Sequence, residues 1–144
     1  MSSKLGDAAR AFVGTPFRLQ GRDPATGLDC VGLVLATLAQ VGVRLDLPAD
    51  YRPRRRSFAI PEVALANAGL IAATGPRAGG DILLLHTAPA QAHAAIAHDG
   101  ATIVHAHARL GRVVLGPQPP DWPTIAAWRL APPSALEEIP QWPP

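Results

Sequence analysis

Cysteine and lysine are almost absent from this chain of 144 residues, which has one of each, Cys30 and Lys4. A lone cysteine cannot form an intramolecular disulfide or a thiolate zinc site, so the sequence implies no disulfide scaffold and no particular redox compartment. The net charge of +2 rests on arginine. The one dense basic cluster, residues 52–56, has no interleaved aromatic residues and no nucleic-acid-binding motif around it, so we expect no nucleic acid partner.

Long hydrophobic runs are also missing. No apolar stretch approaches the roughly 20 residues that a membrane-spanning helix needs, so we expect no membrane partner. The first residues, 1–7, lack the apolar core of a signal peptide. The sequence therefore predicts synthesis in the cytoplasm, and action outside the cell would need another exit route. A hydrophobic content of 48% with 17% charged residues is typical of a globular domain with one core.

Apolar residues recur at helical spacing in the first half of the chain and at strand spacing in the second half. We expect helices over residues 3–13, 30–41 and 57–73, and strands over residues 82–86, 92–97, 101–107, 112–115 and 125–130. Helices followed by strands are typical of an α+β fold, with N-terminal helices packed on an antiparallel sheet of about five to six strands. We expect one domain over residues 1–130 and a proline-rich tail over residues 131–144, either loose or docked as a strap.

Cys30 lies where a polar loop, residues 17–28, gives way to the second predicted helix, and Asp29 before it is a good N-cap. A thiol in the first turn of a helix faces unpaired backbone N–H groups and the positive end of the helix dipole. Both favour the thiolate, which is the nucleophilic form. This position predicts a nucleophile, and the alternative is a small buried hydrophobic residue, as most free cysteines are.

A nucleophilic thiol needs a base, and the base needs a group that orients it. Among five histidines in the strand half, His93 and His105 flank a predicted hairpin turn. A two-residue turn would place them on opposite faces of the sheet. A three-residue turn over 98–100, with Gly100 left-handed, would pair Ala97 with Ala101 and set His93 directly across from His105. A catalytic pair therefore predicts the three-residue turn.

Other roles for these histidines stay open. Each could be an ordinary core or surface residue. His93, His105 and His107 would share a face in the three-residue register, which also allows a zinc site. No carboxylate stands at metal-site spacing beside them, so we expect no metal.

Five short motifs, in the same order, resemble those of the NlpC family of papain-like cell-wall cysteine peptidases, and together they cover roughly residues 5–130. Residues 14–21 (GTPFRLQG) resemble G-x-P-Y-x-x-G-G, 29–34 (DCVGLV) resemble D-C-S-G-L-V, 80–84 (GDILL) resemble G-D-L-V-x-F, 93–96 (HAAI) resemble H-V-G-I, and 103–106 (IVHA) resemble F-I-H-A. The second and fourth motifs together are fairly specific to the family.

The resemblance implies a papain-like NlpC fold in which Cys30 is the nucleophile, His93 the general base and acid, and His105 the residue that orients His93. The oxyanion would form near the backbone N–H of Cys30, beside Asp29, at the head of the helix. The implied substrate is the stem peptide of peptidoglycan, commonly cleaved between D-glutamate and diaminopimelate. No cofactor is implied.

Two further features concern the substrate. Phe17 stands where many members have a tyrosine whose hydroxyl faces the active site, so that donor is missing here. The stem peptide carries free carboxylates, which gives Arg54 and Arg55 of the basic cluster a role in orienting it. A solvated loop is the alternative interpretation of that cluster.

The short form of the chain, with the motif at residues 105–107 followed by 112–114 (RVV), resembles the branch of the family encoded with phage tails and gene transfer agents. That resemblance implies a particle tail component that opens the cell wall, with tail or baseplate proteins as partners. Two alternatives stay open: a non-catalytic tail component that keeps the fold for assembly, and a papain-like amidase or acyltransferase acting on another amide or ester.

Overall fold

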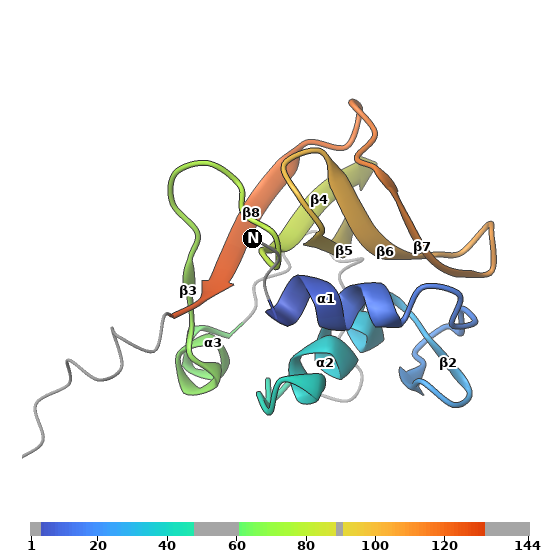
Figure 1. Cartoon of the computed structure of the whole chain (residues 1–144), viewed down its shortest axis with the longest axis horizontal. Coiled ribbons are helices and arrows are strands. Elements are labelled where there is room, and N and C mark those ends of the chain that lie inside the picture. The colour runs from blue at the N-terminus through green and yellow to red at the C-terminus, as the bar shows by residue number, and fades with distance from the viewer. Residues whose placement is uncertain (1–3, 48–60, 89–90, 132–144) are drawn as a thin grey trace, which may run out of the picture.

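The computed structural model describes residues 4–47, 61–88 and 91–131 (Figure 1). The elements are α1 (Lys4–Ala11), β1 (Arg22–Asp23), β2 (Gly27–Leu28), α2 (Cys30–Gln40), α3 (Glu62–Ala68), β3 (Leu70–Ala72), β4 (Ile82–Ala88), β5 (Gln91–Ala97), β6 (Thr102–His107), β7 (Arg112–Pro117) and β8 (Thr124–Leu130). Helices followed by strands confirm the α+β class. The basic cluster with Arg54 and Arg55, and residues 132–144 of the predicted tail, lie outside the described residues.

The six strands β3 to β8 form one antiparallel sheet in the order β3-β8-β4-β5-β6-β7. Helices α1 and α2 lie side by side below it in Figure 1, and α2 contacts β5 and β6. The main core fills the space between them, because α2 is apolar on nearly every side. None of the helices in the described segments is long and apolar enough to cross a membrane.

The sheet carries a second, smaller apolar cluster on its other face, which includes Leu83, Leu85, Ala95 and Ile103. Side chains alternate between the two faces along a strand. His93 and His105 are therefore on the same face as Ala95 and Ile103. This assignment sets the two histidines beside the second cluster rather than inside the main core.

Two predicted elements are wrong in part. The helix expected over 57–73 ends at Ala68, because Gly69 adopts a left-handed conformation (φ 78°) that caps it. Residues 70–72 then form β3, which pairs with β8 at the edge of the sheet through Leu70 and Leu130. The predicted loop over 17–28 also contains the short antiparallel pair β1–β2.

A buried ion pair fastens β4 to β8. Asp81, only 1% exposed, accepts hydrogen bonds from Nε and Nη2 of Arg129 at 2.7 and 2.8 Å and from the N–H of Ala78 at 3.0 Å. Burial by itself would raise the pKa of Asp81, but these hydrogen bonds hold it below its usual range. The Gly-Asp motif at residues 80–81 is thus structural: it fixes the strand next to β5, which carries His93.

Candidate active site

The start of α2 is fastened by the side chain of Asp29. Its Oδ1 accepts a hydrogen bond from the N–H of Gly32 at 2.8 Å, which confirms the predicted N-cap. The same carboxylate accepts from Nη1 of Arg22 at 2.6 Å and from the backbone N–H of Gln20 at 3.0 Å. The loop before the helix is therefore tied to the residue that precedes Cys30.

Gly32 allows this loop to pack against the helix. A Cβ atom at Gly32 would overlap the carbonyl oxygen of Gly21, and that atom is main chain, which cannot swing aside. The glycine two residues after Cys30 is thus required by close packing of loop on helix. The DC-x-G motif reads as one structural unit that holds the thiol in place.

The thiol itself differs from the sequence prediction. Cys30 is half-buried, and burial raises the pKa of its thiol to about 11, with a further increase from the negative charge of Asp29. The N–H groups of Ala94 and Val31 and the charge of Arg22 lower the pKa, but by less. The predicted preference for thiolate is wrong, because loss of solvent outweighs the helix N-terminus. At neutral pH the resting group is a thiol.

His93 and His105 are hydrogen-bonded to each other. Nε2 of His93 lies 3.0 Å from Nδ1 of His105, and the rings meet nearly at right angles, with an interplanar angle of 85°. The predicted arrangement on one face of the sheet is confirmed. This contact engages Nε2 of His93, and Nδ1 is the other nitrogen of its ring.

The predicted register of this hairpin is wrong. Ala97 pairs with Ile103 rather than with Ala101, and Gly100 is not left-handed. The cause is Asp99, whose Oδ1 accepts hydrogen bonds from the N–H groups of Ala101 and Thr102 at 2.8 and 2.7 Å and so draws both into the turn. The register differs from the predicted one by two residues, so every side chain keeps its predicted face of the sheet. His93 and His105 are therefore diagonal neighbours rather than directly opposite each other.

Burial determines the protonation state of His105. His105 is only 5% exposed. Burial lowers its pKa to about 4, with a smaller contribution from the charge of the neighbouring His107. His105 is therefore neutral at pH 7, and its Nδ1 can accept a hydrogen bond from the Nε2–H of His93. That hydrogen bond favours the His93 tautomer in which Nδ1 is unprotonated and basic.

Trp122, which the sequence analysis did not single out, packs against both histidines. Its ring centroid lies 5.6 Å from that of His93 and 5.6 Å from that of His105, in edge-on geometry. Nε2 of Gln118 holds the loop between β7 and β8 by donating to the carbonyl of Trp122 at 2.7 Å. Trp122 lies in a proline-rich loop, where residues follow no helical or strand spacing, so no sequence pattern predicts that it contacts the histidines.

A cleft of about 820 Å³ joins these residues. Its walls include Cys30, His93 and His105, and the predicted Asp29 and Phe17 line it as well; further lining residues are Leu19, Gln20, His107, Arg109, Leu110 and Trp122. Gln20 is the one non-glycine residue with positive φ (59°) among the described residues. No group of three or more His, Cys, Asp or Glu side chains within residues 4–47, 61–88 and 91–131 is arranged to hold a metal ion.

Comparison with known proteins gives the family. The model of the NlpC/P60 family matches residues 14–122. Similar solved structures include the NlpC/P60 domain of the peptidoglycan hydrolase SagA (26% identity, TM-score 0.58, 86% of this chain and 94% of that one) and NlpC2 from Trichomonas vaginalis (18%, 0.64, 88% and 44%). An NlpC/P60 family protein from Bacillus cereus is also similar (19%, 0.61, 90% and 40%).

The present chain thus spans nearly all of the SagA domain but less than half of the Trichomonas and Bacillus proteins. No curated protein matches significantly. The agreement of fold confirms the NlpC-type architecture of helices packed on a six-stranded antiparallel sheet. The family match covers both the Cys30 motif and the hairpin with His93 and His105. This chain therefore belongs to the NlpC/P60 family, whose members are typically cysteine peptidoglycan hydrolases.

Proposed function

We propose that this protein is a cysteine endopeptidase that hydrolyses amide bonds in the stem peptide of peptidoglycan, with Cys30, His93 and His105 as its catalytic triad. The observation that carries the proposal is the 3.0 Å hydrogen bond between His93 and a buried, neutral His105, in the same cleft as the chain's single thiol. This order of nucleophile, base and orienting group is the one that thiol hydrolysis needs.

The proposed reaction begins from a neutral site. Nδ1 of His93 takes the proton of the Cys30 thiol as the sulfur attacks the carbonyl carbon of the scissile amide. The oxyanion develops at the N-terminus of α2, where backbone N–H groups stabilise it. His93 then gives the proton to the leaving amine, the C–N bond breaks, and a thioester remains on Cys30.

Hydrolysis of the thioester completes the cycle. His93 removes a proton from a water molecule that attacks the thioester carbonyl, and the proton passes to the sulfur as the C–S bond breaks. His105 accepts the Nε2 hydrogen bond of His93 throughout and stabilises the imidazolium that forms in each half of the cycle. We propose the bond between D-glutamate and diaminopimelate as the one cleaved, as the resemblance implies.

The test is hydrolysis of purified peptidoglycan by the wild type and by Cys30→Ala, with products identified by mass spectrometry. The wild type should release stem-peptide fragments, and loss of the nucleophile should reduce the rate by more than about a thousandfold. Circular dichroism would check that Cys30→Ala is folded. Equal release by the two proteins, or release by neither, would contradict the proposal. Products in which the acyl group has moved to an added amine would favour the acyltransferase alternative.

We also propose, from the resemblance to the phage-tail and gene-transfer-agent branch, that the enzyme acts as a particle tail component. Particles carrying Cys30→Ala should assemble normally but lose the ability to open the wall. Particles that assemble and penetrate normally with this substitution would favour the non-catalytic tail component instead.

A further inference from the structure

The charges that line the cleft are unbalanced. Asp29 is the carboxylate among the lining residues, and its oxygens are already engaged by Arg22, by Gln20 and by the cap of α2. His105 is neutral at pH 7 because its pKa is about 4. The other fixed charge among the lining residues is the positive charge of Arg109.

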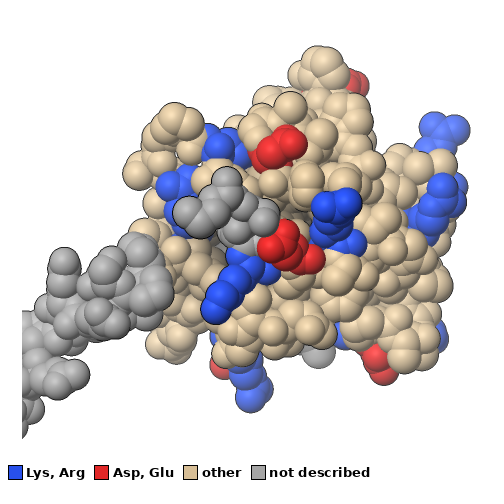
Figure 2. Space-filling view, in the orientation of Figure 1, with Lys and Arg blue, Asp and Glu red and all other residues tan. Residues whose placement is uncertain are grey.

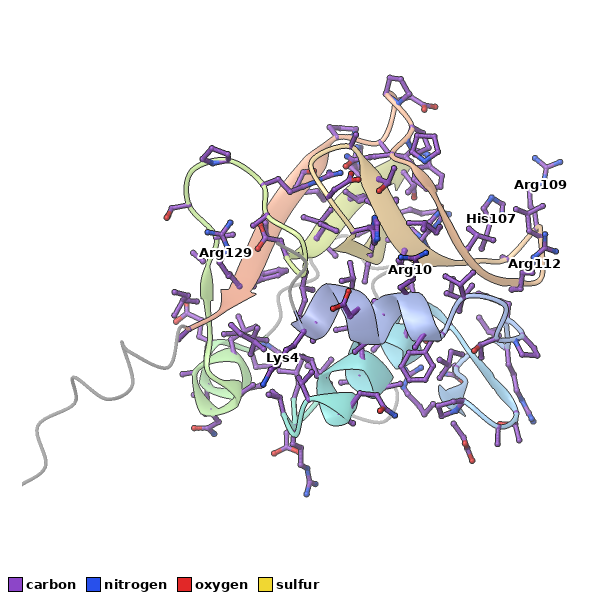
Figure 3. All side chains as sticks on the ribbon, in the orientation of Figure 1. Lys4, Arg10, His107, Arg109, Arg112 and Arg129 are labelled. Carbon is purple, nitrogen blue, oxygen red and sulfur yellow. The ribbon has the colours of Figure 1, made fainter. Side chains whose placement is uncertain are left out.

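Arg109 lies in the turn between β6 and β7, directly after the strand that carries His105. Figure 3 shows Arg109 together with His107 and Arg112 at the right edge of the molecule. In Figure 2, which has the same orientation, the basic atoms at this right edge stand apart from acidic ones on the face shown. Its side chain is exposed, and none of the ion pairs within the described part of the chain includes it.

The neighbours of Arg109 are bound to their own turn. Nδ1 of His107 accepts a hydrogen bond from the N–H of Leu110 at 3.2 Å, and Nη1 of Arg112 donates to the carbonyl of Leu110 at 3.4 Å. These bonds shape the turn that presents Arg109, and they involve no atom of its guanidinium. Arg109 lines the cleft and Arg112 does not.

We propose that Arg109 binds a free carboxylate of the substrate and so makes the enzyme prefer unamidated stem peptides. The inference rests on the proposed function and deepens it. A guanidinium presents paired N–H donors that match a carboxylate, and a carboxamide in the same place loses both the charge and one acceptor oxygen. Arg54 and Arg55, to which the sequence analysis gave a role in orienting the stem peptide, lie outside the described residues.

The experiment compares kcat/KM for three synthetic stem tripeptides: unamidated, amidated on the D-glutamate carboxylate, and amidated on the diaminopimelate carboxylate. The wild type should prefer the unamidated peptide over at least one amidated peptide by about tenfold, the size expected for a charge-assisted hydrogen bond in an exposed setting. Arg109→Gln should lose that preference by cleaving the unamidated peptide more slowly. Arg10→Gln, which removes an equal charge from an exposed position on α1 outside the residues that line the cleft, should keep it.

The preference of the wild type should also shrink as salt is raised, because the pair is exposed to solvent. Equal kcat/KM for all three peptides in the wild type would overturn the inference and leave the proposed function standing. A preference that survives in Arg109→Gln would overturn it too. If the wild type cleaves none of the peptides, the proposed function fails first and the inference with it.

Discussion

Replacing His105 by glutamine should flatten the dependence of stability on pH. The ordinary pKa of histidine is 6.5, whereas burial lowers that of His105 to about 4. Between these values the unfolded chain binds a proton at this position and the folded protein does not. The stability that a neutral His105 provides is therefore fully present above pH 6.5 and is lost as the pH falls to about 4.

The size of this effect follows from the same two values. A gap from 6.5 to about 4 corresponds to about 3 kcal/mol of unfolding free energy, at about 1.4 kcal/mol for each pH unit. Urea denaturation at pH 7 and pH 4 would measure the free energy of unfolding of both proteins. Carboxylates that titrate in this range contribute equally to each, so they cancel when the wild-type change is compared with that of His105→Gln.

His105→Gln should lose about 3 kcal/mol less than the wild type between pH 7 and pH 4. The His86→Gln variant, which removes an exposed imidazole from β4 instead, should follow the wild type. Glutamine can accept the Nε2 hydrogen bond of His93 through its Oε1, so at pH 7 this variant should retain more activity than His105→Ala. Identical pH dependence in His105→Gln and the wild type would refute the conclusion that His105 is buried in its neutral form.

Two further substitutions test what surrounds the proposed triad. Asp29→Asn keeps an N-cap but removes the charge that raises the pKa of Cys30, so the pKa of the thiol should fall below the wild-type value of about 11. The pH dependence of the alkylation rate of Cys30 would measure this pKa. An unchanged or higher pKa would contradict the role given to Asp29. Trp122→Ala should lower kcat by about tenfold, which corresponds to the energy of about one aromatic contact. Trp122→Phe keeps a ring edge against the two histidines, so its kcat should stay near that of the wild type. Equal kcat values for the two variants would count against a positioning role for Trp122.

Structural features of the candidate site could be predicted from the sequence wherever local rules apply. The N-cap at Asp29 follows from side-chain chemistry and the next three residues, and the start of α2 at Cys30 follows from the cap. His93 and His105 share a face of the sheet in every register that differs from the predicted one by an even number of residues. These features survived even though the register of the turn was wrong.

Features that depend on distant parts of the chain could not be predicted. The pKa of Cys30 is set by burial of its sulfur and by groups around it, among them the backbone N–H of Ala94 in β5, more than 60 residues away. Trp122 reaches the histidines from the β7–β8 connection, and no periodicity relates the two segments. The end of α3 was missed for the opposite reason, since Gly69 was present as a local stop signal inside an otherwise helical pattern.

The two shifted pKa values describe a single resting state, in which the Cys30 thiol and the His105 imidazole are both uncharged at neutral pH. A thiolate and an imidazolium formed before substrate arrives would be two charges in a poorly solvated site, and burial of charge costs several kcal/mol per ion. In the proposed mechanism, proton transfer from Cys30 to His93 is therefore favourable only as the sulfur attacks, when negative charge moves on to the substrate oxygen. We therefore expect the orientation of His93 to limit the proposed reaction more than the acidity of the thiol does. His105 and Trp122, which contact the ring of His93, should then matter as much to the rate as the helix that carries Cys30.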